Sequence, residues 1–257
     1  MKKKNHIYTL LNIILILLVI FILYYNILPS IREENIGYVI NLDKRPDRWI
    51  QINKLFSNIP FVLERFSAIN HTEGMKGCGL SHSALIQMAK NNNLPSILIM
   101  EDDCEPSENF IIQWPLIKKW LDSHKNEWDI FIGGNSYYFK ADTNSLSTVK
   151  PICTFNGEIK LYYTKIMALH FYYLNNSGYD IMLKWKEKMK EPIDMWPNET
   201  NMKIVSCTPF IAKQYSDYSN IGNHDTAYYK GVFEDSESKI ASINNIKSCY
   251  KLFKSET

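Results

Sequence analysis

Three adjacent carboxylates, Glu101, Asp102 and Asp103, directly follow a dense apolar segment at 96–100. Side by side, three carboxylates repel one another, which costs stability unless a cation neutralises them. Oxygen ligands suit Mg²⁺ or Mn²⁺, and either ion can bridge to a diphosphate. A solvated acidic turn is the alternative interpretation of the triplet. The position of the triplet at the end of a buried strand favours a metal site instead.

Two more polar clusters follow apolar segments, at 41–45 and at 133–135. Ligands of open α/β sheets bind at the carboxyl ends of the strands, so all three clusters are expected at one edge of a sheet. Arg45 and Arg48 flank the first of these strand ends, and their planar guanidinium groups suit phosphate. Ordinary surface charge at the start of a helix is the other explanation for the two arginines.

A glycine-containing loop at 74–79 precedes a predicted helix that begins at Ser81. The exposed N–H groups of a helix start can receive an anion, and Ser81 can cap the helix instead. His82 is expected either to contact a ligand or to be a buried structural histidine.

Short apolar runs rich in β-formers alternate with segments of helical periodicity. This alternation predicts one α/β domain with a largely parallel, Rossmann-like sheet flanked by helices. Pro115 is expected to break or kink its helix, and a loose polar tail is expected beyond Glu234. The predicted strands are 36–42, 61–66, 96–100, 129–132, 166–174 and 204–211, and the predicted helices are 46–58, 81–89, 110–124 and 178–189.

An uncharged apolar run at 7–28 follows Lys2, Lys3 and Lys4. It has the length that a helix needs to cross the hydrocarbon core, and no small-residue cleavage site ends it. The lysines favour a cytoplasmic N-terminus, which predicts a type II membrane protein with a lumenal domain of Golgi or endoplasmic reticulum type. A bacterial or viral membrane would give the same pattern. The predicted boundaries are 1–6 for the cytoplasmic tail, 7–28 for the transmembrane anchor, 29–35 for a short stem, 36–233 for the main domain and 234–257 for the tail.

The balance of charge and the cysteine pattern exclude some classes of partner. The 257 residues hold 29 basic and 27 acidic side chains, a net charge of +2, so nothing favours nucleic acid. The five cysteines form neither a CxxC pair nor a zinc spacing, and their odd number leaves at least one unpaired within the chain. Sequons at Asn70, Asn175 and Asn198 fit a lumenal glycoprotein.

Several segments together resemble glycosyltransferase family 25, which includes lipopolysaccharide-modifying transferases and the collagen hydroxylysine galactosyltransferases. The segment 38–49 (YVINLDKRPDRW) is similar to its opening motif, 77–83 (GCGLSHS) to its second and 98–103 (LIMEDD) to its third. Gly133 and Gly134 follow at a fitting distance. Further on, 168–172 (ALHFY) is similar to a Thr-His-Ala-Tyr segment and 192–194 (PID) to a Pro-Val-Asp segment of the family. The resemblance rests on this ordered set, which runs from about 36 to 221.

The resemblance implies a GT-A-like fold, a UDP-hexose donor (galactose or glucose) and Mn²⁺ or Mg²⁺ as cofactor. The implied reaction inverts the anomeric carbon. The metal neutralises the departing diphosphate, while a carboxylate takes the proton of the acceptor hydroxyl. The acceptor is expected to be a glycan, a lipopolysaccharide or a protein. Phe171 stands where the family has a small residue after its histidine (His170 here), which is expected to reshape the acceptor side.

Carried over residue by residue, the resemblance assigns Asp103 and Glu101 to the metal and the donor ribose. Asp194 is the candidate catalytic base, and a surface aspartate beside a helix is its alternative role. His224 and Asp217 are rival candidates for a late metal ligand. Together with the chemistry of Arg48 and His82, the resemblance predicts donor binding by Asn41, Asp43, Arg45, Arg48, His82 and Asp102, and metal binding by Glu101, Asp103 and His224.

Two other functions stay open at the level of the sequence. A catalytically inactive relative that acts in adhesion or as a scaffold would have lost its acidic cluster, and the cluster is intact here. A metal-dependent phosphohydrolase would need further carboxylates or histidines converging on the cluster, and the sequence shows no dense second set.

Overall fold

The computed structural model describes residues 2–22, 36–59, 61–142, 144–214, 226–243 and 246–249. Its centre is an eight-stranded sheet in the order β2-β1-β3-β8-β5-β9-β7-β6. Only β8 and β7 run against their neighbours, so the other six strands share one direction and the predicted mostly parallel sheet is confirmed. The strands are β1 (Ile36–Asn41), β2 (Val62–Ser67), β3 (Ser96–Glu101), β5 (Ile130–Ile132), β6 (Lys150–Phe155), β7 (Ile159–Tyr163), β8 (Phe171–Asn175) and β9 (Ile204–Thr208).

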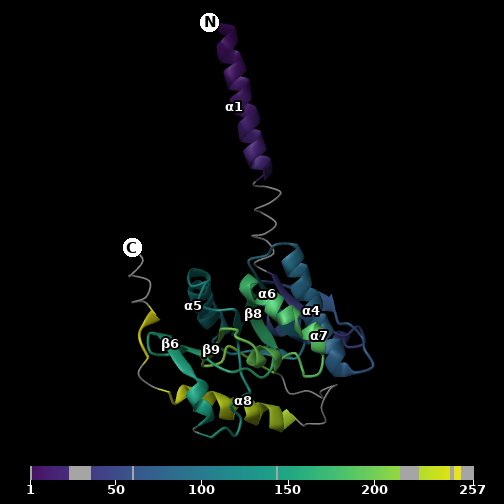
Figure 1. Cartoon of the computed structure of the whole chain (residues 1–257), viewed down its shortest axis with the longest axis vertical. Coiled ribbons are helices and arrows are strands. Elements are labelled where there is room, and N and C mark those ends of the chain that lie inside the picture. The colour runs from purple at the N-terminus through teal and green to yellow at the C-terminus, as the bar shows by residue number, and fades with distance from the viewer. Residues whose placement is uncertain are drawn as a thin grey trace.

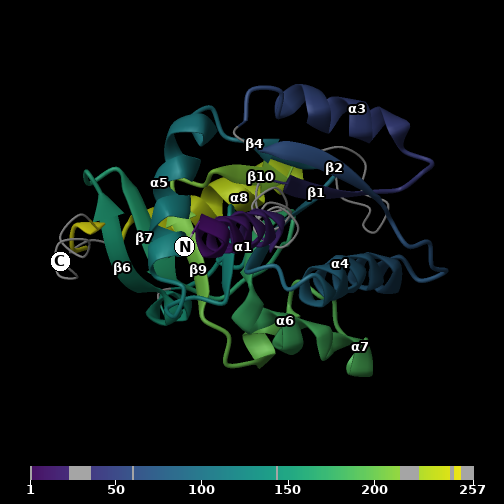
Figure 2. The same ribbon diagram turned by 90° about the horizontal axis from the view of Figure 1, so that it is seen from above.

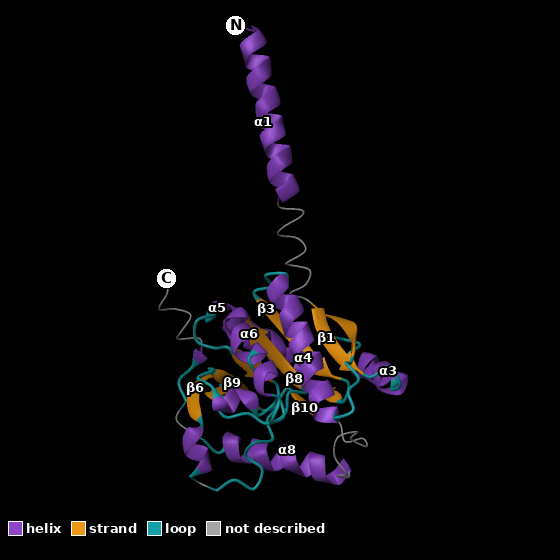
Figure 3. Ribbon diagram, turned by 45° about the vertical axis from the view of Figure 1, so that its right-hand side comes forward, coloured by secondary structure: helices purple, strands orange, loops and turns teal. Residues whose placement is uncertain are grey.

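Helices cover both faces of this sheet, as Figures 2 and 3 show. On one face lie α3 (Pro46–Leu55) and α5 (Phe110–Ser123), and on the other α4 (Gly74–Asn91), α6 (Asn176–Leu183) and α7 (Trp185–Lys188). Successive side chains of a strand point to opposite faces. Met100 of β3 therefore belongs to the core under α5, and its neighbour Ile99 belongs to the core under α4. Both side chains are fully buried, and so the sheet is held from both sides at the point where β3 ends.

The strand predicted at 166–174 begins only at Phe171. Ala168 has a φ of 86°, a left-handed conformation that a β-strand does not allow, so the preceding residues form a loop. The strand β8 then enters the sheet antiparallel between β3 and β5, where strict strand–helix alternation predicts parallel pairing. The helix predicted at 178–189 is divided into α6 and α7, whereas α5 continues through Pro115 without a break.

The chain beyond Glu234 differs from the loose tail that its polarity predicts. Helix α8 (Thr226–Ala241) lies along the lower edge of the domain in Figure 1. Its Phe233 and Ile240 are buried in a third apolar cluster with side chains from 138–162 and 210. A disulfide between Cys153 and Cys249 ties the following segment to β6. Cys78, Cys104 and Cys207 remain as thiols.

A small second sheet lies beside the carboxyl end of β3. In it β4 (Cys104–Pro106) pairs antiparallel with β10 (Ala212–Gln214), so that Gln214 stands opposite Cys104. Two 3₁₀ helices, at Ser145–Thr148 and Trp196–Glu199, complete the described elements.

The N-terminal helix α1 spans Lys2–Ile22, and its large apolar side chains from Ile13 to Ile22 are exposed. Among the described residues, no helix is long and apolar enough to cross a membrane. The anchor predicted at 7–28 therefore has no support from the structure, and its last part, 23–28, lies outside the described residues.

Candidate functional site

A pocket of about 340 Å³ opens at the carboxyl ends of β1 and β3. Its walls come from these strand ends, from the loop between β2 and α4, from the first turns of α4 and from β10. The sequence places its polar clusters at such an edge, and the structure brings two of the three to this pocket. The lining residues with polar or reactive side chains are Lys44, Arg48, Asn70, His71, Thr72, Cys78, Ser81, Glu101, Asp102, Asp103 and Gln214.

Asn41 is the residue that joins three strand ends behind the pocket. It is 1% exposed, and its Nδ2 donates to Asp102 Oδ2 at 2.7 Å and to the Arg45 carbonyl at 2.9 Å. Its Oδ1 accepts a 2.7 Å hydrogen bond from Arg65 Nε on β2. Because β2, β1 and β3 are parallel neighbours, their ends meet at one place, and Asn41 fixes Asp102 there.

Arg48, at the start of α3, reaches back over the end of β3. Its Nη1 lies 2.8 Å from Asp102 Oδ1 and 3.6 Å from Asp103 Oδ2. The side chains of Arg48, Asp102 and Asp103 are each about nine-tenths buried. Asp102 thus has its charge balanced by Arg48 and its second oxygen bonded to Asn41.

The negative charge of Asp103 is balanced less completely than that of Asp102. Its Oδ2 accepts a 3.0 Å hydrogen bond from Gln214 Nε2, while its buried Oδ1 has no hydrogen-bond partner in the part of the chain that the structure describes. Burial and the nearby Glu101 carboxylate raise the pKa of Asp103 to about 7, against the opposing effect of Arg48. An unpartnered carboxylate oxygen in a pocket is a ready ligand for a cation.

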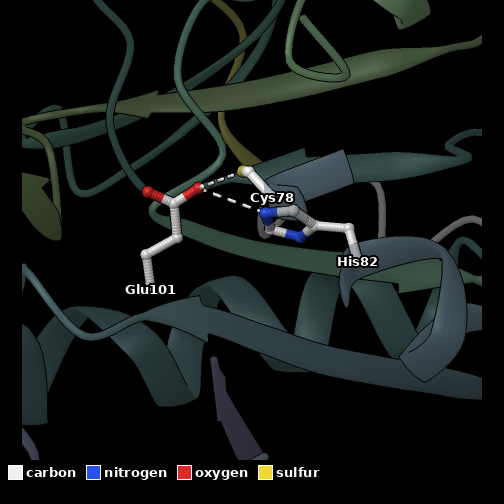
Figure 4. A group of neighbouring side chains, drawn as sticks. All are labelled: Cys78, His82 and Glu101. Atoms are coloured by element: carbon white, nitrogen blue, oxygen red, sulfur yellow. Dashed lines mark hydrogen bonds and ion pairs between the residues drawn. The ribbon is translucent and has the colours of Figure 1, made fainter. Parts of the chain in front are cut away.

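Glu101 lies close to two side chains of α4, Cys78 and His82 (Figure 4). His82 Nε2 lies 3.1 Å from Glu101 Oε1, and the Cys78 thiol donates to the same oxygen at 3.9 Å. His82 Nδ1 is 3.0 Å from the Tyr172 hydroxyl, and the His82 ring is fully buried. Burial by itself raises the pKa of Glu101, but the hydrogen bond with His82 and the effects of His82, His170 and Arg48 together make the net shift of the pKa downward.

The helix start predicted at Ser81 is wrong, because α4 already begins at Gly74. The glycines of the motif lie inside the helix, where they allow close packing. A Cβ on Gly79 would come within 2.1 Å of the Trp185 ring, and one on Gly77 within 2.7 Å of the Ile69 carbonyl. Ser81 does not cap the helix, since its hydroxyl donates to the Gly77 carbonyl and accepts from the Ile69 N–H. The anion-binding role predicted for this helix start therefore has no basis at 77–82.

Four of the six residues predicted to bind the donor do not line the pocket, among them Asp43 and Arg45. The Asp43 carboxylate is exposed and pairs with Arg65 at 2.7 Å. It also accepts a hydrogen bond from the Ser67 hydroxyl, which with Arg65 lowers the pKa of Asp43. Arg45 forms an ion pair with Asp47 at 2.8 Å. The structure thus places Asp102 and Arg48 at the pocket, and Asn41 and His82 directly behind it.

Asp194, the candidate base, is close enough to Glu101 for the two charges to interact. Burial, followed by the Glu101 charge, raises the pKa of Asp194. Its Oδ2 accepts a 3.2 Å hydrogen bond from the Ala168 N–H, and its buried Oδ1 has no partner among the residues described. The rival late metal ligands, Asp217 and His224, lie outside the described residues.

Phe171, which the sequence predicts to reshape the acceptor side, belongs to the core. It is fully buried in β8 and packs edge-on against Phe110 and Trp114 of α5. His170 is equally buried, and its Nε2 lies 3.2 Å from the Ala212 carbonyl. Burial lowers the pKa of His170, so this ring is a neutral part of the core.

Three residues of the site escape reasoning from sequence alone. Arg65, Gln214 and Tyr172 each bond a predicted site residue, namely Asn41, Asp103 and His82. Arg65 lies in β2, the strand next to Asn41 in β1, and an arginine within a predicted strand could have marked it as a candidate site residue. Gln214 and Tyr172 carry no such signal, because only the pairing of β10 with β4 and of β8 with β3 brings them to Asp103 and His82.

The residues present fit a divalent cation at Asp103. The site offers a carboxylate oxygen without a partner among the described residues, and the three carboxylates of the lining (101–103) outnumber its cationic side chains, Lys44 and Arg48. Oxygen donors of this kind select hard ions such as Mg²⁺ and Mn²⁺.

An α/β domain with an acidic pocket at the carboxyl ends of parallel strands is the arrangement typical of nucleotide-binding enzymes. Residues 70–196 match glycosyltransferase family 25 (LPS biosynthesis protein), which confirms the family resemblance of the motifs. The matched segment includes Cys78, His82, the acidic triplet and Asp194. This part of the chain is therefore similar to glycosyltransferase family 25. No curated protein matches the sequence.

Several solved structures align with this chain at low sequence identity and with TM-scores below 0.5. A197 from STIV is 14% identical with a TM-score of 0.41, over 71% of this chain and 85% of that one. A glycosyltransferase involved in the glycosylation of the major capsid of PBCV-1 is 9% identical with a TM-score of 0.37, over 60% and 66%. UDP-glucose pyrophosphorylase complexed with UDP-glucose is 10% identical with a TM-score of 0.38, over 84% and 86%.

Proposed function

We propose that the protein transfers a hexose from a UDP-sugar to a hydroxyl group of a glycan, a lipopolysaccharide or a protein, with Mn²⁺ or Mg²⁺ and with inversion. The family 25 match supports transferase chemistry. The metal-dependent use of a nucleotide sugar is supported by the environment of Asp103. This buried pocket carboxylate has one oxygen without a partner among the described residues and a pKa raised to about 7. Such a group is stabilised as an anion when a cation lies beside it.

The neighbours of Asp103 suit a nucleotide diphosphate. Asp103 would hold the ion, which neutralises negative charge on the leaving diphosphate when it is bound. Arg48 and Lys44, both on the pocket wall, supply positive charge for phosphate oxygens. Glu101 is placed to accept hydrogen bonds from the ribose hydroxyls of the donor.

Asp194 is the proposed base. Its unpartnered oxygen can accept the proton of an acceptor hydroxyl, and its raised pKa brings it nearer to the range in which a general base is effective. The Ala168 N–H holds its other oxygen at 3.2 Å, so the carboxylate is oriented by backbone.

Hydrolysis of a phosphate ester is the competing use of this cluster. The structure does gather His82 and His170 near Glu101, which the sequence does not reveal. Both rings are fully buried, with His82 bonded to Tyr172 and His170 next to the Ala212 carbonyl. Full burial keeps both rings from activating a water, whereas Asp194 is only partly buried.

The test is an assay of the full chain with Mn²⁺ and a panel of UDP- and GDP-sugars, with donor hydrolysis and transfer to simple glycosides as readouts. Wild-type protein is expected to consume a UDP-hexose, and Asp103→Asn is expected to lose this activity together with Mn²⁺ binding, followed by the electron paramagnetic resonance signal of free Mn²⁺. Asp122→Asn, an exposed aspartate on α5, is the matched control. Equal activity of Asp103→Asn and wild type would refute the assignment, and release of free sugar without any transfer would favour the hydrolase.

A further inference from the structure

Cys78, His82 and Glu101 form a cluster that the proposed transferase reaction leaves partly unused. Their candidate ligand atoms, one thiol sulfur, one ring nitrogen and one carboxylate oxygen, all lie within 4.8 Å of one another. Figure 4 shows the three side chains converging from α4 and from the end of β3. We propose that this cluster is a second metal site, which binds a zinc-like soft divalent ion and is distinct from the hard-ion site at Asp103.

The spacing of the three atoms suits tetrahedral zinc. Zinc ligands at about 2.0–2.3 Å in a tetrahedron stand roughly 3.3–3.8 Å from one another. Glu101 Oε1 lies 3.1 Å from His82 Nε2 and 3.9 Å from Cys78 Sγ, and the ligand atoms of Cys78 and His82 lie within 4.8 Å of each other, so side-chain shifts would bring all three toward these separations.

The types of ligand separate this site from a magnesium or manganese site. Thiolate and imidazole favour zinc and other ions on the soft side, whereas Mg²⁺ and Mn²⁺ prefer oxygen. Asp103, with Gln214 as its hydrogen-bond partner, offers only oxygen to an ion. When Cys78 binds the ion its thiol proton passes to solvent, and the bond that the thiol donates to Glu101 is replaced by two bonds to the metal.

His82 has the second hydrogen bond that metal-binding histidines usually have. Its Nδ1 is 3.0 Å from the Tyr172 hydroxyl, so a proton on Nδ1 can be donated there while Nε2 keeps its lone pair for the ion. The His82 ring is fully buried and in contact with the Tyr172 ring, which fixes its orientation.

The fourth position of the ion would open into the pocket. Cys78 and Glu101 both line the pocket, and His82 stands directly behind them. Burial and the Glu101, Asp194 and Asp103 carboxylates raise the pKa of the Cys78 thiol, and a cation bound here would offset this negative charge. Three protein ligands and one open position is the arrangement of zinc sites that keep a site for water or a ligand.

The site has a consequence for the activity, and this consequence rests on the proposed function. Zinc at the cluster would engage Glu101, which the transferase needs for its donor. Zinc is therefore expected to inhibit transfer at saturating Mn²⁺, by occupying Glu101 rather than by replacing Mn²⁺ at Asp103.

Binding is tested with Co²⁺, which replaces zinc and gives a sulfur-to-cobalt absorption band when a thiolate is a ligand. The chelator-treated full chain is titrated with Co²⁺ alone. Wild type is expected to show the band at one equivalent of Co²⁺, to lose it when Zn²⁺ is added, and to keep it when Mg²⁺ is added. Cys78→Ala is expected to lose the band, and Cys207→Ala, which removes another buried thiol remote from the pocket lining, is expected to retain it.

A second variant covers the case in which Cys78→Ala does not fold. Tyr172→Phe removes only the hydroxyl beside His82, and is expected to weaken Co²⁺ binding about 10–100-fold. Absence of the band in wild type, or its persistence in folded Cys78→Ala, would overturn the site.

Zinc inhibition, expressed relative to the Mn²⁺-supported rate of each variant, is expected in wild type and absent in Cys78→Ala. A cobalt band without transferase activity would refute the proposed function but support the metal site. Transferase activity without a band would support the function but refute the metal site.

Discussion

Arg48 and Asp102 form a 2.8 Å ion pair in which both side chains are about nine-tenths buried. The pair joins the start of α3 to the turn after β3, and Asn41 holds the other oxygen of Asp102. Asp103, the next residue, lies 3.6 Å from the same guanidinium and has only Gln214 as a hydrogen-bond donor among the described residues. One carboxylate is thus built into the fold and its neighbour is left for a ligand.

Replacing Arg48 by methionine leaves the Asp102 charge buried without its partner. Removal of one member of a buried pair typically costs about 3–5 kcal/mol. We expect a loss of this order in the free energy of unfolding, measured by denaturant titration. Lys90→Met, which breaks an exposed pair with Asp180, is expected to cost under about 1 kcal/mol. Similar losses for the two variants would show that Arg48 does not compensate Asp102.

Asp103→Asn is expected to change how stability depends on pH in the presence of a chelator. The pKa of Asp103 is raised from an ordinary 3.8 to about 7 by burial and by Glu101, with Arg48 opposing and Gln214 and Asp102 also facing it. Between these values the folded chain keeps a proton that the unfolded chain has lost, so stability falls as pH rises through this window. Above about pH 7 the loss is complete.

The asparagine variant lacks this titration. Its free energy of unfolding, relative to wild type, should therefore rise from pH 4 to pH 7 by on the order of a few kcal/mol and then level off. Denaturant curves collected at pH 4 to 8 measure the difference. A constant offset between the two proteins across this range would contradict the raised pKa.

Asp194→Asn tests the proposed base. The change keeps the hydrogen bond from Ala168 and removes the ability to take a proton, so transfer is expected to fall about 10²–10⁴-fold. Mn²⁺ binding and the KM for the donor are expected to change little. Asp180→Asn, an exposed aspartate of α6, serves as the control. An unchanged rate would place the base elsewhere.

The sequence predicts the parallel part of the fold well for a clear physical reason. β1 and β3 are uninterrupted apolar segments that end in polar residues, so their ends, and with them Asn41 and Glu101, can be located without coordinates. The insertion of β8 between β3 and β5 depends on long-range pairing, which leaves no local pattern. The position of Gln214 beside Asp103 depends on such pairing as well.

The start of α4 is mispredicted because glycine is a poor helix former, and residues 74–79 therefore suggest a loop. In the folded protein, packing outweighs propensity: the Trp185 ring occupies the space that a side chain at Gly79 would need. Gly79→Ala is expected to destabilise the fold by about 1–3 kcal/mol, since the methyl group would lie 2.1 Å from that ring. Thermal unfolding measures the change.

Gly231 is the matched control for Gly79. It lies inside α8, and a Cβ there would meet nothing within 4 Å. Gly231→Ala is therefore expected to stabilise the fold by up to about 1 kcal/mol. The opposite signs of the two alanine variants separate packing from propensity, and two stabilising substitutions would show that Trp185 does not press on α4.

The three sequons differ in whether a glycan could be attached. The Asn175 Nδ2 donates to the Lys125 and Trp128 carbonyls, and the Asn198 Nδ2 donates to the Ile166 carbonyl at 2.6 Å. Both amide nitrogens are therefore hydrogen-bonded within the folded domain. Asn70 is exposed at the mouth of the pocket.

If the domain is lumenal, as the N-terminal pattern predicts, the full chain expressed in a eukaryotic secretory host should carry a single glycan, seen as one glycosidase-sensitive gel shift. Asn70→Gln and Thr72→Ala should both abolish the shift, whereas Thr72→Ser, which keeps the sequon, should retain it. A shift that survives Asn70→Gln would show that Asn175 or Asn198 is glycosylated before its amide is enclosed by the fold. The absence of any shift would count against lumenal placement, because the exposed Asn70 leaves no steric reason for the sequon to be passed over.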